Sequence, residues 1–89
     1  MILDNLTALT IYEVETLQDI FILALKEQEN ILLDMAKIDK IDIVGIQLLL
    51  SMVSTVKASQ KTIKLINVKD TVLQQIKISN TQIALGLDV

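Results

Sequence analysis

The sequence predicts a small α/β domain in which helices pack on a largely parallel sheet. Short apolar runs alternate with stretches of helical periodicity, in the order strand, helix, strand, helix, strand, helix. Such alternation is typical of parallel strands joined by right-handed crossovers. At 89 residues, the chain is long enough for one hydrophobic core and too short for two. We therefore expect residues 1–89 to form a single domain.

The first half of the chain is expected to contain a strand, a helix and a second strand. Residues 3–9 can form a short strand, and Thr10 with Glu13 fits a capping box at the start of a helix over about 12–28. Apolar residues recur at helical spacing within that range. They are Val14, Leu17, Phe21, Ala24 and Leu25. Residues 31–36 begin with an apolar run too short for a helix, which predicts a buried central strand.

A polar turn over 37–40 is expected to lead into a second helix over 43–59, with Asp42 as its cap. Leu48 and Met52 widen the apolar arc of this helix to roughly 200°. Its core stripe is predicted to consist of Ile46, Leu49, Leu50, Val53 and Val56. Its polar face is predicted to consist of Gln47, Ser51, Ser54, Thr55 and Ala58.

The remaining elements complete the crossover pattern. Residues 62–68 are expected to form a strand. This strand should lie parallel and adjacent to residues 31–36, with the second helix crossing between the two strands. Asp70 is the expected cap of a third helix over 71–78, and Asn80 suits the left-handed position after it. The stretch 83–87 is expected to be a short closing strand or a docked tail.

The composition argues against most classes of enzyme and against nucleic-acid binding. The chain has no Cys and no His, which removes thiol chemistry, the commonest general base and the commonest metal ligand. It has eight Lys, no Arg and a net charge of −3, so phosphate contacts are poorly supplied. Only Tyr12 and Phe21 are aromatic, so base-stacking platforms are missing too. We expect no cofactor and no bound metal.

The sequence also gives an expectation about location. The first residues contain no cationic stretch followed by an apolar one, so no signal peptide is expected. The longest purely apolar run in the first helix, Ile20 to Leu25, is far shorter than the ~20 residues of a membrane-spanning helix. The expected location is the cytoplasm, without direct membrane insertion.

The stretch from Ile38 to Leu50 resembles the signature of STAS domains, the fold of the anti-sigma factor antagonists. In that signature a strand leads to an Asp, two small residues that often include Ser or Thr, a Gly and an aliphatic residue, where a helix begins. Asp42, Gly45 and Ile46 match it here. Segments before the first helix and after the third also resemble the family, so the likeness covers about residues 6–82.

The resemblance implies a regulatory protein-binding module and not an enzyme. Members of the family bind anti-sigma kinases, transporter ATPases or sensory complexes. In the anti-sigma antagonists, phosphorylation of a Ser or Thr in the signature ends binding, because phosphate adds about −1.5 to −2 charges to the interface. Here Ile43 and Val44 stand between Asp42 and Gly45. The phosphorylation switch is therefore expected to be absent from its usual position, Val44.

The resemblance places the partner-binding surface at the start of the second helix. The candidate partner-binding residues are Asp42, Ile43, Val44, Gly45, Ile46 and Leu48, with Leu23 of the first helix as a second contact or self-association residue. A relocated phosphorylation site on the second helix is a further hypothesis, against the default of a solvated face. Its candidates are Ser51, Ser54 and Thr55.

Each candidate also has a purely structural interpretation. Asp42 can act only as a helix cap, and Gly45 can serve tight packing on the sheet as well as close approach of a partner. Ile43 and Val44 can contact a partner or tuck under the sheet edge. Leu23 can be an isolated exposed apolar residue of the ordinary kind.

Three functions compete at this point. The first is a binding module in bacterial partner switching or sensory signalling, with an anti-sigma factor or kinase-like partner. The second is an accessory subunit of a transporter that binds its ATPase. The third, an enzyme or nucleotide-binding domain, is disfavoured because the chain has no Gly-rich phosphate loop and no Arg. Formation of a homodimer is left open.

Overall fold

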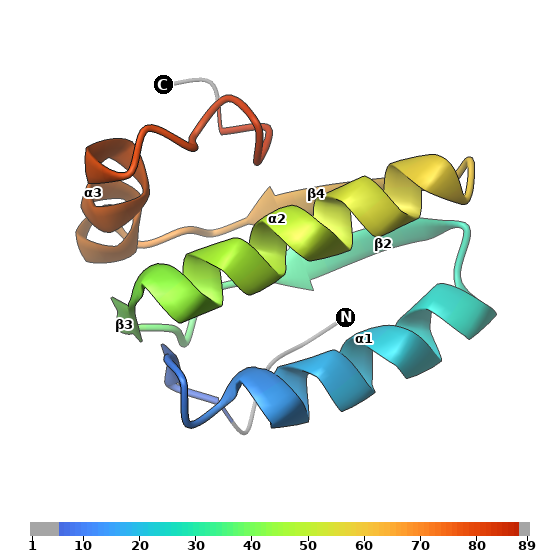
Figure 1. The fold of residues 1–89 in the computed structure, drawn as a ribbon, viewed down its shortest axis with the longest axis horizontal. Helices are drawn as coiled ribbons and strands as arrows, with labels where there is room; N and C mark the ends of the chain where they lie inside the picture. Colours follow the sequence, from blue (N-terminus) through green and yellow to red (C-terminus); the bar gives the residue numbers. More distant parts are fainter. Residues whose placement is uncertain (1–5, 88–89) are drawn as a thin grey trace.

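The computed structural model describes residues 6–87, and it confirms the predicted α/β architecture (Figure 1). Residues 3–5 of the expected first strand lie outside this range. The elements are β1 (Ala8–Leu9), α1 (Val14–Glu27), β2 (Asn30–Asp34), β3 (Lys40–Ile41), α2 (Ile43–Ala58), β4 (Thr62–Ile66) and α3 (Asp70–Ile78). Among the described residues, no helix is both long and apolar enough to cross a bilayer.

The strands pair in two parallel ladders. β2 pairs with β4 from Asn30 opposite Thr62 to Asp34 opposite Ile66, with α2 crossing between them as predicted. β1 pairs with β3, with Ala8 opposite Lys40. Each ladder has two strands, and β2 and β3 are successive parts of one stretch of chain that contributes to both.

A turn inside this shared stretch separates the two ladders. The Asp34 carboxylate accepts the N–H of Ala36 (3.0 Å), and Ile38 donates its N–H to the carbonyl of Met35 (3.0 Å). This side-chain turn ends the strand at Asp34. The prediction of a strand over 31–36 and a turn over 37–40 is therefore wrong by a few residues, because the turn begins earlier and Lys40 already belongs to β3.

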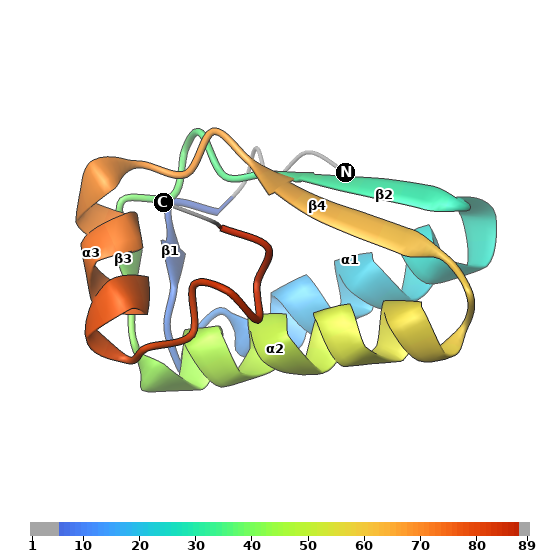
Figure 2. The same cartoon turned by 90° about the horizontal axis from the view of Figure 1, so that it is seen from above.

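Both α1 and α2 cover the same face of the β2–β4 ladder, while α3 stands at the end near β3 (Figure 2). α2 is rotated slightly from the predicted orientation. Met52 is buried, whereas Leu50 is only partly buried at the edge of the core. At 3.6 residues per turn, the buried arc is centred nearer Leu49 and Val56 than the predicted stripe. The predicted polar face of α2 is exposed.

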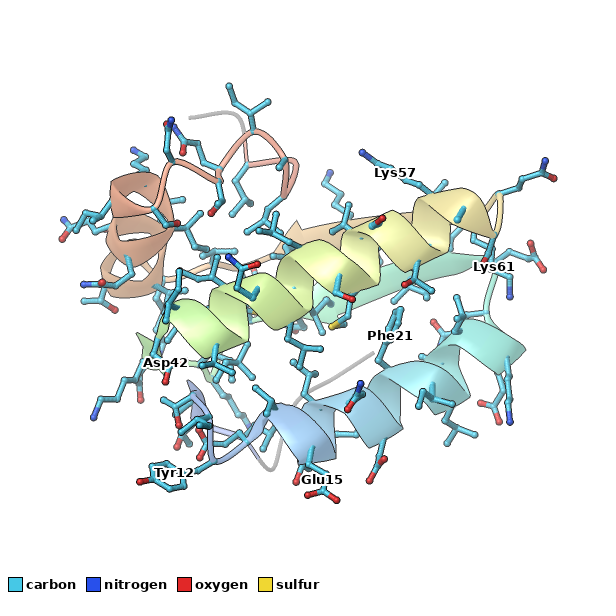
Figure 3. All side chains as sticks on the ribbon, viewed as in Figure 1. Tyr12, Glu15, Phe21, Asp42, Lys57 and Lys61 are labelled. Carbon is cyan, nitrogen blue, oxygen red and sulfur yellow. The ribbon has the colours of Figure 1, made fainter. Side chains whose placement is uncertain are left out.

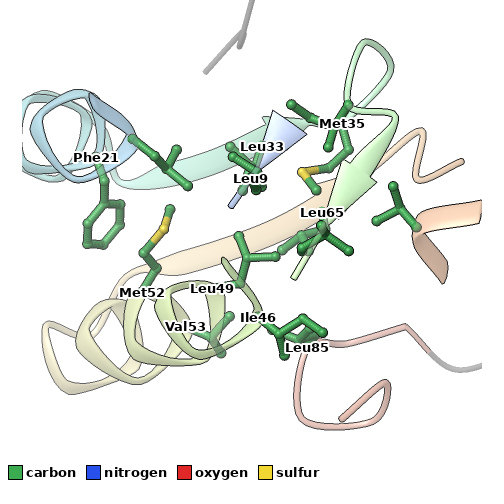
Figure 4. Packing of buried hydrophobic residues seen from close by; sticks show 14 of the residues in the cluster. Leu9, Phe21, Leu33, Met35, Ile46, Leu49, Met52, Val53, Leu65 and Leu85 are labelled. Atoms are coloured by element: carbon green, nitrogen blue, oxygen red, sulfur yellow. The ribbon is translucent and has the colours of Figure 1, made fainter. Parts of the chain in front are cut away.

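The core lies between these two helices and the strands (Figure 4). Leu33 and Leu65 contribute from the paired strands, and Phe21 of α1 lies beside Met52 of α2. The C-terminal stretch is a docked tail. Its Leu85 is buried beside Ile46 and Val53 (Figure 4), and residues 83–87 contain no strand.

The two ends of α3 differ in how well they were predicted. Asn80 adopts the expected left-handed conformation (φ 61°), and its N–H donates to the carbonyl of Lys77 (3.0 Å). Asp70 is not the cap of α3. It is the first residue of the helix, after an N-cap Lys69 without a side-chain cap hydrogen bond. A carboxylate in the first turn still stabilises the helix dipole.

Candidate partner-binding site

The start of α2 is tied to the loop before α1 through one carboxylate. Asp42 caps α2, since its Oδ1 accepts the N–H of Gly45 (2.9 Å). Its other oxygen, Oδ2, accepts the N–H of Ile11 (3.1 Å), which lies 31 residues earlier in the chain. The N–H of Asp42 donates to the carbonyl of Leu9 (3.2 Å). Asp42 is therefore both a helix cap and the organiser of a contact between two segments.

The loop over residues 10–13 is itself held by the predicted pair of Thr10 and Glu13. The N–H and the hydroxyl of Thr10 both donate to Glu13 Oε1 (2.9 and 2.6 Å), and Glu13 donates its N–H to the Thr10 carbonyl (3.0 Å). Tyr12 donates its N–H to the Thr10 hydroxyl (3.3 Å). α1 begins after this turn, at Val14, with Glu13 as its N-cap residue. The capping-box residues thus form a closed turn just before the helix.

Gly45 serves the packing of α2 on β1. A Cβ atom at this position would lie 2.0 Å from the carbonyl oxygen of Leu9 and 3.1 Å from Cγ1 of Ile41. Gly45 is also buried. Between the two interpretations of this glycine, the structure supports close contact within the fold, which brings β1 and α2 together under the site.

The structure divides the predicted site residues into exposed and buried sets. Ile43 is 57% exposed, and Val44 and Leu48 are partly exposed. Ile46 is buried in the core, so it cannot contact a partner directly. The side chain of Ile46 points into the core because it lies on the same face of α2 as Leu49, one turn along. Ile46 is corrected from a contact residue to a core residue.

Sequence reasoning missed two residues beside Asp42. Ile11 is 60% exposed and Tyr12 is 88% exposed, the largest exposed fraction among the large apolar and aromatic side chains of the described residues. Figure 3 shows Tyr12 and Asp42 at the same end of the molecule, with the Tyr12 ring pointing outward. A capping box whose two middle residues are both large and apolar was the signal available in the sequence.

We call the set Ile11, Tyr12, Ile43 and Val44 the α2-start surface. Ile43 follows Asp42 in the chain, and Ile11 binds the Asp42 side chain, so the loop and the helix start are neighbours. The chain segments around this surface carry acidic residues. Residues 10–16 and 42–47 contain three carboxylates and no Lys, and the nearest Lys in the sequence is the exposed Lys40.

Leu23 lies apart from the α2-start surface. It is 58% exposed on α1, nine residues after Val14, which is about 14 Å along the helix. The neighbouring exposed Ile22 is about 100° away around the helix axis, so the two do not form one stripe. The structure therefore does not bring Leu23 together with Asp42. Ser51, Ser54 and Thr55 are exposed on the outer face of α2.

A comparison with known protein families shows to which family this fold belongs. Residues 6–85 match the model of a family described as Mlab, STAS domain. The chain belongs to the STAS domain family. No curated protein and no solved structure gave a significant match. STAS domains are generally non-catalytic regulatory modules that mediate protein–protein interactions, and the resemblance inferred from Asp42, Gly45 and Ile46 is confirmed at the level of the family.

Proposed function

We propose that this STAS domain is a binding module of the anti-sigma factor antagonist type, which acts in bacterial partner switching or sensory signalling. The observation that carries the proposal is the apolar α2-start surface, with Ile43 57% exposed at the first position of α2. An exposed aliphatic side chain, held in place by a capped helix start, is suited to bury against another protein.

The chemistry at position 44 separates this domain from its phosphorylated relatives. Val44 stands where the resemblance puts the phosphorylated Ser or Thr, and a valine has no hydroxyl to accept phosphate. Binding would therefore not be ended by phosphorylation at this position. Control would come from the concentration of the domain or from the state of its partner.

The same observation supports a second candidate, an accessory subunit that binds the ATPase of a transporter. A subunit that stays bound to its transporter needs no phosphorylation switch, so the hydroxyl-free sequence at 43–44 fits this role too. The identity of the partner distinguishes the two functions. An anti-sigma factor with a kinase domain supports the first, and a transport ATPase supports the second.

The test compares partner capture by the wild-type chain and by two matched variants, in extracts of the native cell. Ile43→Asp places a carboxylate on the α2-start surface, and Ile83→Asp makes the same change at an exposed isoleucine in the tail. Desolvating an unpaired carboxylate against an apolar surface is costly, so Ile43→Asp should lose the partner. Ile83→Asp should retain it.

Both variants should keep the fold, which thermal unfolding will check. α2 has no acidic residue in its first turn, and an Asp there interacts favourably with the helix dipole. Ile43 is a better target than Val44, because Val44 is half-buried and a carboxylate there would also disturb packing. Retention of the same partner by folded Ile43→Asp would refute the proposed binding surface.

A further inference from the structure

The α2-start surface is built from two segments that are far apart in the sequence. The loop 10–13 and the start of α2 meet at Asp42, whose two carboxylate oxygens each accept one backbone N–H. Ile11 supplies one N–H and Gly45 supplies the other. In an asparagine side chain, one of these two positions is an NH2 group, which donates and cannot accept a backbone N–H. The position of the loop relative to the helix thus depends on the carboxylate.

The loop presents the most exposed aromatic side chain of the described residues. Tyr12 is 88% exposed, and within the described residues its hydroxyl has no hydrogen-bond partner. Its backbone is nevertheless ordered by the turn that Thr10 and Glu13 form. Tyrosine is enriched among the residues that dominate binding energy, because it buries a large rigid area and brings one polar atom.

We propose that Tyr12 is the main anchor of the partner interface and that Asp42 is the positioning residue that holds its loop against α2. This inference rests on the proposed function of the α2-start surface and extends the contact surface to Ile11 and Tyr12. The partner is a protein with an apolar pocket for the tyrosine ring.

The charges around the loop indicate what borders that pocket. Glu13 and Glu15 follow Tyr12 closely in the chain, and segments 10–16 and 42–47 carry no positive charge; the nearest lysine in the sequence is the exposed Lys40. A pocket bordered by Lys or Arg complements this arrangement, and complementary charge mainly raises the rate of association. Association should therefore slow when the salt concentration rises from about 0.05 M to about 0.5 M, because exposed charges become screened.

The positioning role of Asp42 can be tested on the isolated chain by backbone NMR relaxation. Asp42→Asn keeps one acceptor oxygen, so we expect the cap on Gly45 to persist and the bond from Ile11 to be lost. The order parameter of Ile11 should fall from about 0.85 toward about 0.6, while that of Gly45 stays unchanged. In Asp42→Ala both amides should lose order. An unchanged order parameter at Ile11 in both variants would overturn the positioning role.

The anchor role is tested with the purified protein that the wild-type chain captures and Ile43→Asp does not. Tyr12→Ala should weaken binding to it at least about tenfold, and Asp42→Asn should weaken it by a smaller factor. Ile83→Ala, which removes an apolar side chain that is 78% exposed elsewhere on the molecule, should leave the affinity unchanged. Tyr12→Phe separates the ring from its hydroxyl, and retained affinity there assigns the contact to the ring.

The outcomes of these experiments are distinguishable. If Ile43→Asp binds as wild type does, the proposed function fails and so does the extension. If Ile43→Asp loses the partner while folded Tyr12→Ala binds within twofold of wild type, the α2 start is a binding surface but Tyr12 is not its anchor. Equal losses in Tyr12→Ala and Ile83→Ala would also overturn the anchor role.

Discussion

Replacing Gly45 with alanine tests how tightly α2 is fitted against β1. The new Cβ would lie 2.0 Å from the carbonyl oxygen of Leu9 and 2.9 Å from its carbonyl carbon, so either the strand or the helix must move by more than about 1 Å to restore van der Waals contact. The atom in the way belongs to the backbone. It is also fixed, because the same Leu9 carbonyl accepts the N–H of Asp42 (3.2 Å).

Two opposing terms set the size of the effect. Overpacking a well-filled site costs about 1–3 kcal/mol and occasionally more, and a clash with a hydrogen-bonded backbone belongs at the upper end. Alanine in a helix interior is favoured over glycine by about 1 kcal/mol. We therefore expect Gly45→Ala to lower the free energy of unfolding by about 2 kcal/mol or more, which corresponds to roughly 8–16 °C in Tm for a domain of this size.

Urea unfolding followed by circular dichroism measures this difference, with Gly86→Ala as the control. Gly86 has a φ of +74°, and a Cβ added there would have no neighbouring atom within 4 Å, so alanine costs only the left-handed backbone conformation, about 1–2 kcal/mol. If Gly45→Ala were as stable as wild type or more stable, the helix preference of alanine would have prevailed, and the close contact of α2 with β1 would be refuted.

Three further predictions address the core, the titration of one side chain and the signature loop. Leu49→Ala should cost about 2–5 kcal/mol in urea unfolding, and Leu50→Ala clearly less, since Leu49 is buried and Leu50 only partly so; equal losses would contradict the observed rotation of α2. The N–H of Ala36, together with the side-chain amide of Asn67, lowers the pKa of Asp34 from its ordinary value. The ionised form of Asp34 therefore stabilises the fold above about pH 4, and this contribution to the free energy of unfolding is lost as the pH falls through the lowered pKa. A carbon-13 titration of the carboxyl group should give a midpoint below that of an unfolded peptide, and a midpoint at or above it would contradict the hydrogen bonds described. Incubation with a cognate kinase and ATP should leave the loop 42–46 unmodified in peptide mass analysis, and phosphate found there would overturn the interpretation of a hydroxyl-free switch position.

Local chemistry is what made parts of this structure predictable from the sequence. Asp42 is predictable as a helix cap because a carboxylate suits the free N–H groups at a helix start, and it accepts the N–H of Gly45 as expected. The left-handed conformation of Asn80 is predictable because asparagine tolerates it, and its φ is 61°. Both features depend on residues within a few positions along the chain.

Features that depend on distant residues were harder to predict. β3 has two residues, and what makes it a strand is its pairing with Ala8 and Leu9 of β1. The structure buries Met52 where the sequence pattern predicts Leu50, and this difference has a similar cause. When the apolar arc of a helix spans roughly 200°, its rotation is set by the neighbouring elements. Phe21 from α1 lies beside Met52, and no pattern within α2 reveals that contact.

In the candidate site too, features set by nearby residues were predictable and features set by distant residues were not. The sequence is compatible with a partner contact or internal packing at Gly45, and only the position of the Leu9 carbonyl reveals the packing role. The capping box of Thr10 and Glu13 accounts for Ile11 and Tyr12 as part of a helix start, so the sequence pattern does not predict them as site residues. The link from Ile11 to Asp42 spans 31 residues, so the membership of this loop in the surface became visible only in three dimensions.

The single stretch of chain that contributes to both ladders also shapes how the domain can fold. Ala8 pairs with Lys40 and Asn30 pairs with Thr62, so in the described part of the chain each pair of strand partners is 32 residues apart. Such contacts stabilise the chain only after a long loop has closed, and the entropy lost in closing that loop slows folding relative to a protein built from hairpins. Once one ladder has formed, however, the segment 30–41 is already in place for the other. Folding of the two halves should therefore be strongly coupled, with the second pairing following quickly on the first.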